Sequence, residues 1–251
     1  MTVDIEKISS FLKKIPVSEY YNWEIPFDKG EGRNIFQEED LTRFSSMSNF
    51  ESNVYLKTIL SDKIKTAFQD HDTDALRQIF EWIVHDWGGI RNGRNNIDNL
   101  YHMGIEAIKN GNLTFNRIAS TSKILSFYDP TNHIIYDSRI AFSLNTIMLL
   151  VNASEKFFPV PSGTNSKMNA FNIKVLIRLK HKSDVYKRNG SKKLIYIADK
   201  TLFYNRNKAY SIVHDTIQRI NKKIYESEPD KAVKPFYTEM LLFGIADTFN
   251  L

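Results

Sequence analysis

The sequence contains no cysteine. Disulfide bonds, cysteine-ligated zinc and iron–sulfur clusters are therefore excluded, and with them the cysteine-bound zinc of nucleobase deaminases. Only ten glycines and seven prolines occur among 251 residues, which argues against long disordered tracts. With a hydrophobic content of 42%, the chain is long enough to bury a substantial core. We expect no metal or other cofactor.

Long hydrophobic runs are also missing. The most apolar stretch, residues 140–151, contains Ser and Asn and is too short to span a bilayer. The N-terminal residues MTVDIEKISS carry early acids and lack the apolar segment of a secretory signal. The sequence therefore predicts a soluble, cytoplasmic protein with no membrane partner, and we expect a monomer.

The net charge of +5 is unevenly distributed. Between Lys174 and Lys223, fourteen Lys and Arg residues face three acids, a net charge of +11 that leaves −6 for the remainder. A basic segment interleaved with aromatic residues suits a polyanion, because each neutralised phosphate releases counterions. The solvated face of long helices explains the same composition, and an anionic membrane surface is a third interpretation.

Apolar residues recur at helical spacing along most of the chain, which predicts a mainly α fold. Gly88-Gly89 and Gly111 are expected to end helices, and Asp74 or Thr73 to cap one. LIYIA at residues 194–198 is expected to form a short strand. The predicted helices lie near residues 5–12, 54–64, 76–84, 100–108, 118–128, 138–151, 167–186, 208–225 and 234–249.

Residues 120–144, STSKILSFYDPTNHIIYDSRIAFSL, form the most informative segment. Lys123 lies on an apolar helix that Asp129-Pro130 ends, and Asp137 takes the N-cap position of the next helix. A cationic amine and a carboxylate on adjoining helices can stabilise or trap a sugar cation. Helix capping by Asp137 and a snorkelling Lys123 are the simpler interpretations.

The capping and catalytic interpretations of Asp137 are compatible. Amides of the first helical turn hold a carboxylate ionised near neutral pH, and the ionised form is needed to stabilise a sugar cation or to orient water. Ser120, Thr121 and Ser122 lie just before Lys123, at a predicted helix start. Exposed hydroxyls and amides there would suit phosphate binding.

A lysine on a helix after a turn, then a loop, then YDSRI at residues 136–140 opening a second helix resembles the helix-hairpin-helix DNA glycosylases. The similarity is to their 8-oxoguanine glycosylase-like branch. It implies two helical lobes with a base flipped out of double-stranded DNA between them, which is how such enzymes reach a base. It also implies that Asp137 is the catalytic aspartate and Lys123 the Schiff-base nucleophile of bifunctional members.

The segment departs from that family at two points. Residues 113–123, LTFNRIASTSK, lack the glycines of the family's hairpin, and the fourteen positions from Lys123 to Asp137 are fewer than is usual. Two mechanisms therefore stay open. Lys123 attacks the sugar, or Asp137 and water hydrolyse the bond alone.

A flipped base needs an aromatic or apolar pocket. We expect Trp87, Tyr128 and Tyr136 to form it, with Trp87 the most exposed, whereas Trp82 and Phe127 are predicted core residues. Phosphate contacts are expected from Arg91, Arg94 and Arg139. The chain is predicted to be one unit, residues 1–251, with the Lys–Asp pair in a lobe at 85–151 and a second lobe from 1–84 and 152–251.

The leading hypothesis is a DNA glycosylase, a hydrolase that excises a damaged or modified base, in DNA repair or in antiviral defence against modified phage DNA. A non-catalytic DNA- or RNA-binding protein on the same scaffold is the alternative. An RNA-cleaving toxin is the least favoured, because the nearest arginine and histidine, Arg206 and His214, are widely spaced. The identity of the base does not follow from the sequence.

Overall fold

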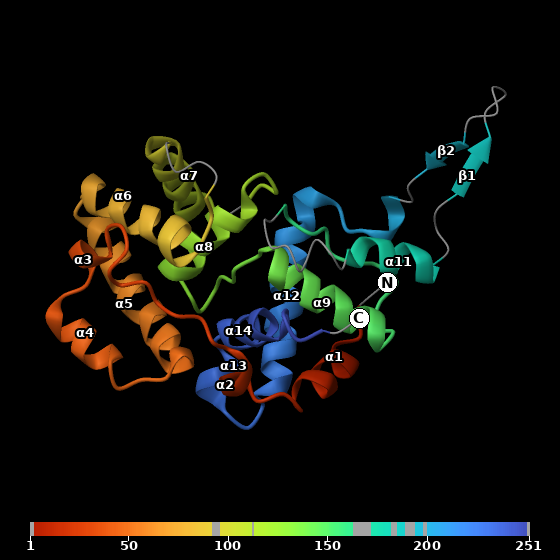
Figure 1. The fold of residues 1–251 in the computed structure, drawn as a ribbon, viewed down its shortest axis with the longest axis horizontal. Helices are drawn as coiled ribbons and strands as arrows, with labels where there is room; N and C mark the ends of the chain where they lie inside the picture. The colour runs from red at the N-terminus through yellow and green to blue at the C-terminus, as the bar shows by residue number, and fades with distance from the viewer. Residues whose placement is uncertain are drawn as a thin grey trace.

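The computed structural model describes residues 3–91, 96–111, 113–162, 172–181, 185–188, 194–197 and 200–249. The fold is mainly α-helical, as predicted (Figure 1). The helices pack into two lobes, and the chain passes from one lobe to the other between α8 and α9.

The α5–α8 lobe contains the helices that follow one another in the first half of the chain. α5 packs on α6 and α8, and α7 packs on both α6 and α8. Leu60, Phe80 and Ile124 are fully buried within it. Its elements are α3 (Gly32–Ile35), α4 (Glu38–Phe44), α5 (Asn49–Gln69), α6 (Thr73–Glu81), the π-helix η1 (Trp82–Trp87), α7 (Ile97–Asn110) and α8 (Ile118–Tyr128).

The α9–α14 lobe joins both ends of the chain. α1 packs on α12, and α14 packs on α2, α9 and α12, so N-terminal and C-terminal helices share one core. Its helices are α1 (Ile5–Leu12), α2 (Val17–Tyr20), α9 (Ser138–Leu150), α11 (Ile173–His181), the 3-10 turn η2 (Lys200–Leu202), α12 (Arg206–Ile224), α13 (Pro229–Ala232) and α14 (Phe236–Ile245). The boundary between these two groups of helices falls between α8 and α9.

A short hairpin is the exception to the helical fold. β1 (Val185–Arg188) pairs antiparallel with β2 (Leu194–Ile197), with Tyr186 opposite Tyr196. The predicted strand at 194–198 is confirmed, whereas the helix expected over 167–186 is wrong at its end, because α11 stops at His181. β-branched and aromatic residues such as Val185 and Tyr186 favour a pleated ladder over a helix.

Local capping residues determine where the helices begin and end, and the N-cap of α6 lies before both of the predicted residues. Asp72 caps α6 by accepting the Ala75 amide at 3.0 Å, so the expected caps Asp74 and Thr73 are wrong. The chain turns at His71, which has a φ of 57°, and Asp72 is the first residue after it. Gly111 ends α7 with a φ of 61°, as predicted.

The core contains two of the aromatic residues that the sequence assigned to it. Trp82 and Phe127 are fully buried, as predicted. Within the described part of the chain, no helix has both the length and the apolar character needed to cross a membrane.

Candidate active site

Lys123 and Asp137 meet at the boundary between the two lobes. Lys123 projects from α8 of the α5–α8 lobe, and Asp137 precedes α9 of the other lobe. The Lys123 Nζ lies 3.0 Å from Asp137 Oδ2, and the two side chains are 5% and 12% exposed. The ion pair therefore joins the two lobes.

Asp137 is the N-cap of α9, as predicted. Its Oδ1 accepts the Arg139 amide at 3.0 Å and the Ile140 amide at 3.2 Å, while Oδ2 accepts from Lys123. Burial raises the pKa of this carboxyl, but the Lys123 ammonium and the helix amides outweigh burial and hold the pKa below its usual range. Asp137 is therefore ionised at neutral pH.

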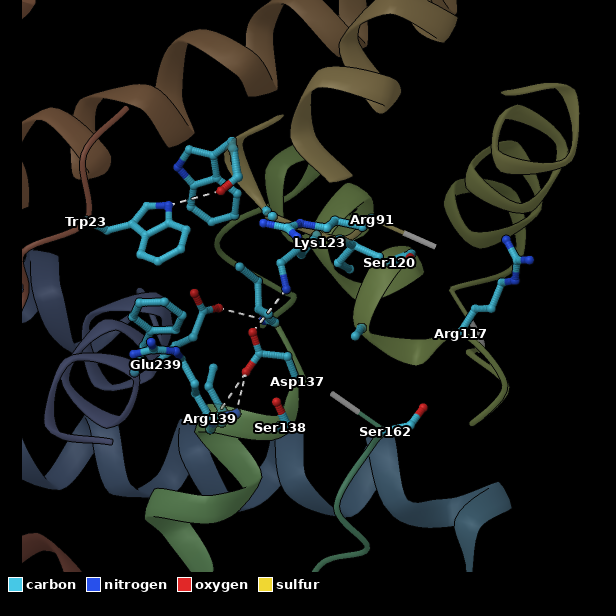
Figure 2. A pocket seen from close by; sticks show the side chains of 18 of the residues that line it. Trp23, Arg91, Arg117, Ser120, Lys123, Asp137, Ser138, Arg139, Ser162 and Glu239 are labelled. Atoms are coloured by element: carbon cyan, nitrogen blue, oxygen red, sulfur yellow. Dashed lines mark hydrogen bonds and ion pairs between the residues drawn. The ribbon is translucent and has the colours of Figure 1, made fainter. Parts of the chain in front are cut away.

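Both side chains line a cleft of about 540 Å³ (Figure 2). The aromatic lining comes from Tyr21, Trp23, Trp87 and Phe243, and the charged lining includes arginines and Glu239. Concave sites with apolar walls and a few convergent polar groups are typical of small-molecule and base recognition. The volume of the cleft is within the usual range for small-molecule sites.

A glycine turn makes room for Lys123. A Cβ atom on Gly88 would lie 2.9 Å from Lys123 Cδ and 2.7 Å from the Ile83 carbonyl oxygen, so a larger residue would displace the lysine stem. Gly89 follows with a φ of 65°. The His85 ring contacts the Ile90 carbonyl through Nδ1 at 2.5 Å and fixes this turn. π-helices such as η1 often occur at functional sites.

Trp87 lines the cleft but is not the exposed residue that the sequence suggested. It is 6% exposed, because its Nε1 donates to Asn53 Oδ1 at 2.9 Å and its ring meets Phe127 edge to face. Its carbonyl accepts from Trp23 Nε1 at 3.0 Å. Trp87 is thus a fixed wall of the cleft.

The other two predicted base-pocket residues do not line the cleft. Tyr136 is fully buried and donates its hydroxyl to the Pro159 carbonyl at 2.5 Å. Burial raises the pKa of its phenol far above the usual range. Tyr128 packs against Phe68 and Lys65 at the far end of α8. Neither ring is therefore among the residues that line this cleft.

The three hydroxyl residues at the start of α8 separate in the structure. Ser120 lines the cleft. Thr121 donates to the Arg117 carbonyl at 3.3 Å, and Ser122 accepts the Tyr136 amide at 3.0 Å. Thr121 and Ser122 thus make hydrogen bonds to backbone groups of the protein, and of the three hydroxyl residues only Ser120 lines the cleft.

Two of the predicted arginines lie at the cleft. Arg91 lines its rim, and Arg139 lines its wall with a 2.6 Å ion pair to Asp247 and its guanidinium 4.8 Å from the Phe243 ring. Arg94 lies outside the described residues. Arg139 is therefore held in place by protein partners, and Arg91 is the more accessible of the two.

Sequence reasoning missed several lining residues, among them Tyr21, Trp23, Arg117, Glu239 and Phe243. All of these except Arg117 come from segments far from α8 and α9 in the chain. The spacing of Glu239 and Phe243, one helical turn apart on an apolar helix, was the available signal for a shared face.

Comparison with protein-family models, with curated proteins and with solved structures found no match to this chain. The geometry of the cleft is therefore the basis for assigning a function.

Proposed function

We propose that this chain is a DNA glycosylase that removes a damaged or modified base. The observation that carries the proposal is the 3.0 Å contact between Lys123 Nζ and Asp137 Oδ2 on the wall of an aromatic-lined cleft. The reaction would break the bond between C1′ and the base, with the bonding electrons leaving with the base. Positive charge then develops on the sugar, and the ionised Asp137 would stabilise it.

Two attacking groups fit the cleft. A water molecule oriented by Asp137 would add its oxygen to C1′ and release a proton, giving an abasic site. Alternatively, Lys123 would transfer a proton to the departing base or to Asp137, and its free amine would attack C1′ as the base leaves. The C1′–O4′ bond would then break, with a proton moving from the lysine nitrogen to O4′, to give a protonated Schiff base. The 3.0 Å contact with Asp137 places a proton acceptor beside the amine, which supports this route.

The turn before α8 supports DNA binding despite its lack of glycine. Arg117, the residue before α8, has a φ of 56°, the left-handed conformation that glycine usually adopts. Arg117 differs in residue type from the glycines in the hairpin of the helix-hairpin-helix glycosylases, but its backbone adopts the left-handed conformation that glycine favours. Arg117 and Ser120 both line the cleft, where a phosphate beside the target nucleotide would bind.

The test is a panel of duplexes carrying different modified bases, treated with alkali after incubation. Wild-type protein should yield strand breaks. Asp137→Asn should reduce the rate by about 100-fold or more, the usual loss when one group that stabilises charge in the transition state is removed. Asp4→Asn is the matched control, because Asp4 also caps a helix and pairs with a lysine, but at the surface. Equal cleavage by Asp137→Asn and wild type would rule the assignment out.

Borohydride trapping separates the two mechanisms. Lys63 pairs with Asp40 and does not line the cleft, so Lys63→Gln is the control. A covalent protein–DNA adduct that is absent in Lys123→Gln and kept in Lys63→Gln would establish the amine route. Base release without any adduct would establish the hydrolytic route.

A non-catalytic DNA-binding protein is the second candidate. The observation that favours it is the internal pairing of Lys123 with Asp137, which satisfies both charges without a substrate. Salt-sensitive binding to duplex DNA with no base released from any member of the panel would support this candidate over the enzyme.

A further inference from the structure

A second buried ion pair crosses between the lobes beside the first. Lys57 on α5 lies 3.3 Å from Glu239 on α14, and their side chains are 3% and 4% exposed. Isolated charges are costly to bury, and a buried pair is weak evidence for stability alone. A role at the cleft explains its position next to the Lys123–Asp137 pair better than stability does.

Each member of this pair holds one of the two elements that carry Lys123 and Asp137. Glu239 Oε2 accepts the Ile135 amide at 2.6 Å, two residues before Asp137. Lys57 Nζ donates to Ser126 Oγ at 2.8 Å, three residues after Lys123 on α8. The Lys57–Glu239 pair thus ties the backbone before α9 to the helix that carries Lys123.

Lys57 is enclosed by aromatic rings as well as by its polar partners. Its ammonium lies 5.0 Å from the centre of the Phe127 ring and 5.5 Å from that of Phe236. Cation–π contacts of this kind help to compensate a desolvated charge. Lys57 does not line the cleft, whereas Glu239 does.

Glu239 adds a second carboxylate to the wall that contains Asp137 (Figure 2). Burial raises the pKa of Glu239, and the neighbouring Asp137 raises it further, while Lys57 and the Ile135 amide lower it. Because the pKa of Asp137 is lowered and that of Glu239 is raised, Glu239 takes up its proton before Asp137 does as the pH falls. The ionisable and charged groups around Glu239 are Lys57, Lys123, Asp137, Arg139, Tyr21 and Tyr210.

We propose that Lys57 and Glu239 form a positioning pair for Asp137, which fixes the chain before α9 and places a second negative charge in the cleft. This inference rests on the proposed glycosylase function, because it assigns the pair to the same site. Glu239 acts through the Ile135 amide and through its charge, and Lys57 acts through Glu239 and Ser126.

The first test is the pH dependence of base release by Glu239→Gln. The amide oxygen of Gln still accepts the Ile135 amide, so this variant removes the charge and keeps the anchor. Because the pKa of Glu239 is raised and that of Asp137 is lowered, Glu239 protonates first as the pH falls, and the wild-type kcat should drop with the loss of its charge. Glu239→Gln lacks this charge at every pH, so its kcat profile should lack this step.

A second variant tests the anchor. Glu239→Ala removes both the charge and the bond to Ile135, and kcat should fall about 100-fold, as misplacement of a reacting group by about 1 Å does. Glu226→Gln is the matched control, because Glu226 pairs with Lys13 and Lys223 at the surface and does not line the cleft. It should change neither the rate nor the profile.

A profile of Glu239→Gln that superimposes on wild type, or a uniform loss of rate that keeps the wild-type step, overturns the proposal. If Glu239→Ala fails to fold, Glu239→Gln still tests the proposal, because glutamine has nearly the same size and shape as glutamate.

A measurement without DNA separates this inference from the proposed function. Carboxyl NMR titration of the wild type should place the pKa of Glu239 above its usual range, with the Ile135 amide shift following the same midpoint. In Asp137→Asn that midpoint should fall. If no duplex releases a base, the proposed function fails, and an unchanged midpoint in this titration would independently overturn the coupling.

Discussion

At the scale of single residues, the ion pair at the cleft makes the ionisation of Asp137 part of the stability of the fold. Burial raises the pKa of its carboxyl, but the Lys123 ammonium and the α9 amides outweigh burial, so the folded pKa lies below the unfolded value. The ionised form therefore favours folding above the unfolded pKa of about 3.9, and this contribution disappears as the pH falls through the folded pKa.

Replacing Asp137 with Asn should destabilise the protein by about 3 kcal/mol at neutral pH, because the buried Lys123 loses its partner. Asn still caps α9, so the loss reports the ion pair. Asp4→Asn, which alters a surface pair of the same type, should cost at most about 1 kcal/mol. Urea unfolding at pH 7 and at pH 3 measures both variants, and the difference between Asp137→Asn and wild type should shrink at pH 3. A difference that does not depend on pH would contradict this account.

At the scale of elements, the glycine turn after the π-helix η1 controls the position of Lys123. Gly88→Ala would place a Cβ atom 2.7 Å from the Ile83 carbonyl oxygen, which cannot move freely, and 2.9 Å from Lys123 Cδ. We expect a destabilisation of about 1–3 kcal/mol and the loss of base release, because the lysine stem is displaced.

Gly89→Ala is the control for that prediction. Its Cβ atom would meet no atom within 4 Å, so only the backbone strain of its φ of 65° acts. It should cost about 1–2 kcal/mol and keep its activity. Thermal unfolding measures the stability of the two variants, and the base-release assay measures their activity. Equal activity of the two variants would show that the turn does not position Lys123.

The elements also show what the sequence could and could not predict. α8, α9 and the Asp137 cap follow from local signals, namely apolar spacing, Asp129-Pro130 and an aspartate before an apolar run. The burial of Trp87 depends on Asn53, which belongs to another helix, and the cleft residues Trp23 and Glu239 come from opposite ends of the chain. Such contacts are tertiary, so periodicity along one segment does not reveal them.

At the scale of the whole molecule, two buried ion pairs connect the lobes. The loss of stability on mutating the Lys57–Glu239 pair should depend on whether one partner or both are removed. Lys57→Met or Glu239→Gln alone leaves an unpaired buried group and should destabilise by about 3–5 kcal/mol. The double variant should be much closer to wild type. A double-mutant cycle from urea unfolding measures the coupling, and additive losses would show that Lys57 and Glu239 act independently.

Like charges lie close together near Lys174 of α11 and Arg206 at the start of α12. Burial and the nearby Arg206 and Arg178 lower the pKa of Lys174. Arg206 also lies 5.1 Å above the Phe115 ring, close in sequence to the cleft residue Arg117. A DNA phosphate would relieve this repulsion, because it neutralises charges that the fold places together.

Lys174→Gln and Arg206→Gln should each weaken duplex binding and reduce the slope of log K against log salt by about 0.9 for every phosphate that the variant no longer neutralises. Lys7→Gln, a surface lysine paired with Asp4, is the control and should leave the slope unchanged. Binding titrations over a range of salt concentrations measure the slope. If the slopes of Lys174→Gln and Arg206→Gln equal that of wild type, this cluster is a solvated face and the DNA follows another path across the protein.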